Sequence, residues 1–130
     1  MTPGHVTSPI ILTSGAIVIN TNLTITGPGA STLTVSGNNN SLVFSESFLA
    51  VAISGLTISG GKNTGGLGGG IYTDAPVTLT NSTVSGNIAT TGGGGIFNEG
   101  TLTMTNSIVS AKYRRLRWRD LQCWRADADQ

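Results

Sequence analysis

The most constraining feature of the sequence is a repeat with a period of about 23–26 residues, a size typical of solenoid units. The segments VTLTNSTVSGN and TLTMTNSIVS place Asn81 and Asn106 one period apart, and GGGIYT and GGGIFN place Ile71 and Ile96 at the same separation. Self-similarity at a fixed period is typical of repeat architectures, in which each unit packs only on its neighbours.

Earlier parts of the chain extend the repeat. VAISGLTISGG matches VTLTNSTVSGN one period downstream, and LTVSGN matches LTISGG in the same way. We also align Val43-Phe44 with Ile71-Tyr72 and Ile96-Phe97, as one position in three successive units. The sequence therefore predicts about four units.

Each unit consists of short strands and turns. Apolar residues and Thr alternate over 77–80 and 102–105, which is the period of a half-buried strand. No segment shows helical periodicity over a length sufficient for a helix, so helical crossovers are not expected. A unit of this size and kind predicts one coil of a parallel β-helix. The predicted fold is all-β, with like residues stacked over like at a strand spacing of roughly 4.8 Å.

Two kinds of turn residue recur in the units. Asn81 and Asn106 fall at the same turn, where they either form a ladder of stacked amides or serve as ordinary left-handed turn residues. Both alternatives stay open from the sequence. The glycine runs ending at Gly70 and Gly95 are expected to provide sharp turns with positive φ rather than a flexible linker, because an Ile-aromatic pair follows each run.

These motifs resemble the coils of bacterial right-handed parallel β-helix repeat proteins. LTITGPG, LTISGG, GGGIYT and GGGGIFNEGTLTMTNS are similar to repeats of large exported proteins related to the polymorphic outer membrane proteins, which carry a Gly-Gly-aliphatic motif. The resemblance covers roughly positions 8–110. It implies a non-catalytic display segment of an adhesin-like protein at the outer membrane or cell surface, with host or cell-surface ligands bound by other parts of that protein.

The carboxyl-terminal segment differs in composition from the repeat. Residues 1–111 hold three acids and a single base, whereas residues 112–130 hold six bases, both Trp and the one Cys. We therefore predict a repeat region at 1–110 and a non-repeat basic tail at 111–130. We interpret the tail as out of frame, because a one-base shift turns Gly codons into Arg and Trp codons. A short helical cap and a basic nucleic-acid arm are the alternatives.

The sequence offers few groups for chemistry. The repeat region has only Glu46, Asp74 and Glu99 as acids and contains no Arg. The sequence therefore predicts no catalytic site, no metal site and no cofactor, and a carbohydrate-active, pectate-lyase-like enzyme remnant is the rival hypothesis. Paired outward Thr residues suggest ice binding as a further, minor alternative.

Further expectations concern partners and location. No apolar stretch reaches the roughly 18 residues of a membrane span, and we recognise no signal peptide at the start. We expect no nucleic-acid partner. Strand edges at the two ends of the stack predict a tendency toward end-to-end self-association.

Overall fold

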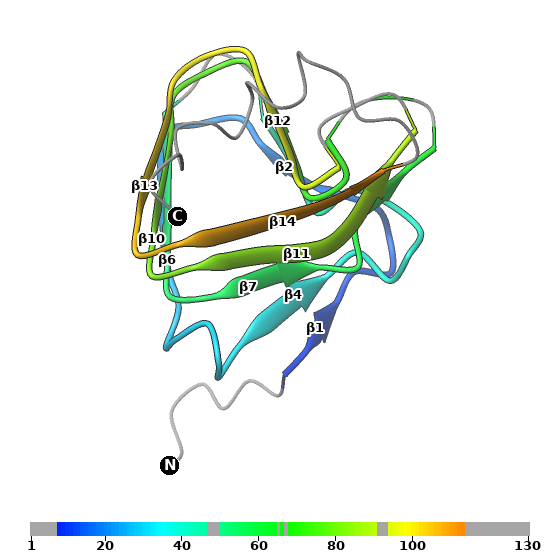
Figure 1. Ribbon diagram of the computed structural model, residues 1–130, viewed down its shortest axis with the longest axis horizontal. Coiled ribbons are helices and arrows are strands. Elements are labelled where there is room, and N and C mark those ends of the chain that lie inside the picture. The colour runs from blue at the N-terminus through cyan, green and yellow to red at the C-terminus, as the bar shows by residue number, and fades with distance from the viewer. Residues whose placement is uncertain (1–7, 47–49, 65, 67, 91–93, 114–130) are drawn as a thin grey trace.

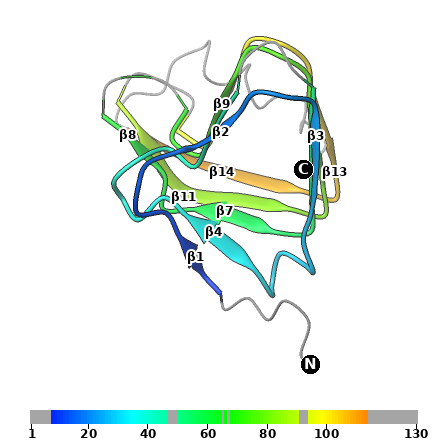
Figure 2. The same ribbon diagram turned by 180° about the vertical axis from the view of Figure 1, so that it is seen from behind.

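The computed structural model describes residues 8–46, 50–64, 66, 68–90 and 94–113. Within these residues the chain passes repeatedly through three parallel sheets, which we name A, B and C, always in the same order (Figure 1; Figure 2). Each passage through the three sheets is one coil, and successive coils lie on one another. The chain is a parallel β-solenoid of about four turns.

Each sheet collects one strand from each coil. Sheet A contains β1 (Ile10–Ile11), β4 (Thr34–Ser36), β7 (Thr57–Ser59), β11 (Thr83–Ala89) and β14 (Ile108–Tyr113), and β8 (Lys62–Asn63) also pairs with β11. Sheet B contains β2 (Ile17–Ile19), β5 (Phe44–Glu46), β9 (Ile71–Thr73) and β12 (Ile96–Asn98). Sheet C contains β3 (Leu23–Thr26), β6 (Val51–Ser54), β10 (Val77–Thr80) and β13 (Leu102–Thr105).

The register of sheet C shows why the repeat produces this stack. Val77 pairs with Val51 on one side and with Leu102 on the other, and every strand pair of the sheet is parallel. Side chains alternate along a strand, so the residues in register with Val77 and Leu79 point to the inside. The residues that alternate with them along each strand point to the outside. Because a one-residue slip would reverse the two faces, the alternating sequence itself fixes the register.

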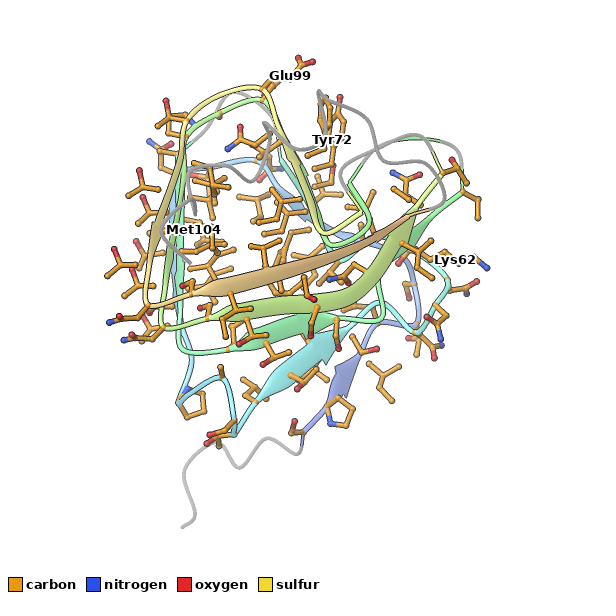
Figure 3. All side chains as sticks on the ribbon, viewed as in Figure 1. Lys62, Tyr72, Glu99 and Met104 are labelled. Carbon is orange, nitrogen blue, oxygen red and sulfur yellow. The ribbon has the colours of Figure 1, made fainter. Side chains whose placement is uncertain are left out.

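The interior consists of aliphatic rows that run along the stack, and side chains fill the space between the three sheets (Figure 3). In sheet C, Ile53 and Leu79 are buried and lie in register with each other. In sheet A the row consists of Ile10, Val35, Ile58, Val84 and Val109. Full burial of one such side chain stabilises the fold by about 1.5–3 kcal/mol.

One detail of the predicted repeat is wrong. The structure pairs Phe44, not Val43, with Ile71, which in turn pairs with Ile96. Val43 therefore lies where the later coils have Gly70 and Gly95. Both Val43 and Phe44 are buried in the core.

The glycines before Ile71 serve close packing as well as turning. Gly68 has a φ of +73°, as the glycine run predicts, but Gly69 and Gly70 have no positive φ. A Cβ atom on Gly70 would lie 2.6 Å from the carbonyl oxygen of Gly95 and 3.0 Å from Nδ2 of Asn87. Gly70 is therefore needed because another coil and a buried amide approach its backbone.

The last described strand passes the predicted boundary of the repeat region. β14 continues to Tyr113, and its residues 111–113 pair with Asn87, Ile88 and Ala89 of β11. Residues 114–130, on which the frame-shift, cap and basic-arm interpretations rest, lie outside the described residues.

Candidate functional site

The outward face of sheet C is the most regular surface of the described chain. Two outward positions on each strand are in register from β3 to β13. A row of side chains projects from this side of the stack in Figure 3. The first position holds Thr24, Ala52, Thr78 and Thr103, and the second holds Thr26, Ser54, Thr80 and Thr105. Three of the four strands thus present a Thr-x-Thr pair, whereas the alternation in the sequence indicated only the two pairs at 77–80 and 102–105.

Most of these hydroxyl groups face solvent. Thr24, Thr78 and Thr103 are exposed, and Thr80 is half-buried. Among the described residues, no side-chain hydrogen bond involves any Thr hydroxyl of the sheet C face. A shallow hollow on this side is lined by Thr24, Ala52 and Thr78 of the outward positions. It is also lined by residues at the starts of the strands, namely Asn22, Leu23, Ala50, Val51 and Pro76. The face is therefore a nearly complete array of hydroxyl and methyl groups.

The outward face of sheet A also carries Thr and Ser, but some of these side chains form hydrogen bonds within the chain and most are half-buried. Its first row holds Thr34, Thr57, Thr83 and Ile108, and Ser36 is paired with Ser59 in the next outward position. The Thr57 hydroxyl donates a hydrogen bond of 2.7 Å to the Ala30 carbonyl, and Ser36 Oγ accepts one of 3.1 Å from the Asn38 amide. Most of its outward side chains are half-buried, so this face contributes to the packing of the adjacent loops.

Sheet B carries an aromatic pair on its outward side. The rings of Tyr72 and Phe97 stack with centroids 5.7 Å apart and an interplanar angle of 13°. These two residues are paired in register, so each ring belongs to one of two neighbouring coils. Such a pair adds about 0.5–1.5 kcal/mol beyond the area it buries. Phe97 is 2% exposed and Tyr72 is half-buried, so the pair fixes the two coils against each other in a largely covered position on the outward side of sheet B.

The two acids next to this pair take equivalent places. Thr73 pairs with Asn98, and the Glu99 amide donates to the Thr73 carbonyl at 3.1 Å, so Asp74 and Glu99 occupy the same turn in neighbouring coils. Glu99 is exposed, and Asp74 is half-buried. The structure thus brings together two acids that lie one full repeat apart in the sequence.

Asn81 and Asn106 lie at a corner where the backbone is left-handed. Their φ values are +50° and +49°, and Gly55 at the equivalent place in the preceding coil has a φ of +71°. Both Asn side chains are exposed, and within the described residues no hydrogen bond joins them. This geometry fits the left-handed turn alternative, since Asn and Gly are the residues that adopt this conformation most readily.

A hydroxyl ladder lies one residue later, inside the corner. Ser82 and Ser107 are buried, and the Ser82 amide donates to Ser107 Oγ at 3.1 Å. Each hydroxyl in turn donates, at 2.9 Å, to the carbonyl of the residue two positions earlier. The side-chain link between coils is therefore made by serine rather than by the neighbouring asparagine.

Sequence reasoning missed Asn87, the most completely bonded buried side chain among the described residues. It is 0% exposed. Its Oδ1 accepts from the Gly61 amide at 2.8 Å, and its Nδ2 donates to the carbonyls of Ile58 at 3.0 Å and Ser85 at 3.1 Å. The amide thus ties two neighbouring coils together inside the stack.

A bulge in β11 explains why Asn87 points inward. The register between β11 and β14 shifts between Val84 and Asn87, and Gly86 within the bulge has a φ of +66°. Simple alternation from the buried Val84 would send Asn87 outward. The Ser-Gly-Asn sequence is the available signal, because a glycine can begin a bulge that reverses the alternation.

Within the described residues, no three His, Cys, Asp or Glu side chains are grouped so that they could hold a metal ion. The described part of the chain also contains no helix with the length and hydropathy that a membrane crossing requires. Comparison with protein-family models, with curated proteins and with solved structures finds no match to this chain.

Proposed function

We propose that this chain is a non-catalytic structural segment of an exported bacterial surface protein, which extends and displays recognition regions encoded elsewhere. The observation that carries the proposal is the regular stack itself. The same register runs through all four strands of sheet C, and its two inward rows are apolar throughout. A stack of this kind has a length set by the number of coils, which is the property a spacer needs.

The surface and adhesin parts of this proposal rest on the resemblance of the Gly-Gly-Ile and TNS motifs to exported repeat proteins. In this role the coils contact only one another and water. Other coils would continue the stack, and ligands would bind to regions beyond it.

The genomic DNA on both sides of the coding region tests the proposal. We expect an upstream signal peptide and a downstream anchor or outer-membrane barrel in the same reading frame or in the frame that a one-base shift restores after Ser110. Further coils bearing Asp and Arg clusters would instead indicate an enzyme and would contradict the proposal. Resequencing the codons around Ser110 tests the frame shift separately.

A carbohydrate-active enzyme is the second candidate, and the positions of Asp74 and Glu99 favour it. The backbones of equivalent positions on neighbouring coils are separated by roughly 4.8 Å along the stack. Two side chains on such positions can bring their carboxyl groups to the separation of about 5–5.5 Å that retaining glycosidases use. The aromatic pair of Tyr72 and Phe97 lies beside them.

An activity assay separates the two candidates. Under the structural proposal, the chain releases no reducing ends and no unsaturated sugars from polygalacturonate or other polysaccharides. Activity that disappears in Asp74→Asn and in Glu99→Gln, while Glu46→Gln keeps it, would establish the enzyme instead.

A further inference from the structure

The face of sheet C is periodic in two directions. Neighbouring strands are spaced by roughly 4.7–4.9 Å, and outward positions along one strand are separated by about 6.5 Å. The parallel register holds from β3 to β13 without a shift, so the Thr positions form straight rows. A ligand that matches this face must itself repeat at a spacing of a few ångströms in two dimensions.

The hydroxyl groups of this face are already held in place. β6 and β10 are each hydrogen-bonded to strands on both sides, which fixes their backbones. Thr is β-branched and has few side-chain rotamers in a strand, so little conformational freedom remains to be lost on binding. Among the described residues the Thr hydroxyls of this face have no intramolecular partner. Preorganised groups of this kind reduce the entropic cost of binding.

The composition of the face excludes several classes of ligand. None of the four strands contains a charged or aromatic residue. A nucleic acid requires basic groups, and a divalent cation requires carboxylates. Stacking against the apolar face of a sugar ring generally uses a large aromatic side chain. The face offers only hydroxyl and methyl groups.

We propose that the outward face of sheet C binds the surface of ice crystals. Crystalline water repeats in two dimensions, needs neither charge nor aromatic contact, and both donates and accepts hydrogen bonds as Thr hydroxyls do. The Thr methyl groups exclude disordered water between the hydroxyl rows. Ala52 is the one position of the two rows without a hydroxyl, and with Thr24 and Thr78 it is among the residues that line the hollow. This activity is independent of the display role, which uses the interior of the stack.

Inhibition of ice recrystallisation by the full chain tests the proposal. We expect the chain to inhibit, and Thr78→Lys to lose the inhibition because a long charged side chain stands in the middle of the array. Thr103→Lys, in the adjacent strand, is expected to behave in the same way. Thr83→Lys is the matched control on the outward face of sheet A and keeps the inhibition. Ala52→Thr fills the missing position and strengthens it.

Three outcomes would overturn the proposal. The first is a folded chain, verified by circular dichroism, that leaves ice recrystallisation unchanged. The second is equal loss in Thr78→Lys and Thr83→Lys when both variants keep the circular dichroism spectrum of the parent. The third is that the chain sediments with crystalline cellulose or chitin, that Thr78→Lys abolishes this binding, and that the chain has no effect on ice. This result would assign the face to a polysaccharide.

Discussion

The inner coils and the first coil of the stack are built from the same strand pattern but are buried to different extents. In sheet C, Val51 and Val77 are 4% and 2% exposed, whereas Leu23, which is in register with them in the first coil, is 38% exposed. The three residues lie on inward positions of strands with similar alternation. The first coil, which contacts one coil only within the described residues, is therefore the less buried and weaker end of the stack, whereas Leu102 of β13 at the other end of sheet C is 8% exposed.

The largest effect is expected in the middle of an inner row. Leu79→Ala removes a fully buried side chain between Ile53 and Met104 and leaves a cavity that the neighbouring coils cannot fill. We expect the free energy of unfolding to fall by about 3 kcal/mol, measured by urea denaturation with circular dichroism. If the free energy of unfolding falls no further than in Leu23→Ala, the inner coils are not more stabilising than the first coil.

The second effect concerns the buried amide that joins two inner coils. Asn87→Ala leaves the Gly61 amide and the Ile58 carbonyl without their partner inside the stack. We expect a loss of about 2–3 kcal/mol in the same denaturation experiment. Asn40→Ala is the control, because Asn40 is exposed, and it should change the stability little. Equal effects of the two substitutions would show that Asn87 does not tie the coils together.

The third effect concerns the left-handed corner of the third coil. Asn81→Ala places a less tolerant residue at a φ of +50°, so we expect a loss of about 1 kcal/mol. Asn81→Gly keeps the conformation accessible and should leave the stability almost unchanged. If Asn81→Gly and Asn81→Ala are equally destabilising, the side-chain amide rather than the backbone conformation matters at this corner.

The smallest effect is expected in the first coil. Leu23→Ala removes a side chain that is already partly exposed, so we expect a loss below about 1 kcal/mol. Amide hydrogen exchange sharpens the contrast, because β10 is paired on both sides and β3 is paired with β6 only among the described strands. The amides of β3 should exchange faster than those of β10, and the opposite order would contradict the account.

The solenoid itself could be predicted from the sequence. The repeat spacing of Ile71 and Ile96 and the alternation over 77–80 and 102–105 are local signals that survive in any coil, and the structure confirms the stacked parallel coils. The offset of Val43-Phe44 could not be predicted, since it depends on which residue of β5 pairs with Ile71 of β9.

The details of the surface and of the buried polar groups were harder to infer. Asn87 points inward only because the bulge at Gly86 reverses the alternation, and a bulge is set by the pairing of two strands. Thr24 and Thr26 join the Thr rows only once β3 is placed in register with β6. Both depend on contacts between coils, which a single segment of sequence does not record.

Disulfide cross-linking tests the in-register parallel stack most directly. In a Cys123→Ser background, Thr78→Cys with Thr103→Cys places two thiols at paired positions of adjacent strands, within the Cα separation of about 4.4–6.8 Å that a disulfide accepts. Thr78→Cys with Thr105→Cys places them diagonally, at roughly 8 Å, which is too far. We expect rapid intramolecular oxidation of the first pair and little of the second. Equal oxidation of both pairs, or preference for the diagonal pair, would contradict the stacked register.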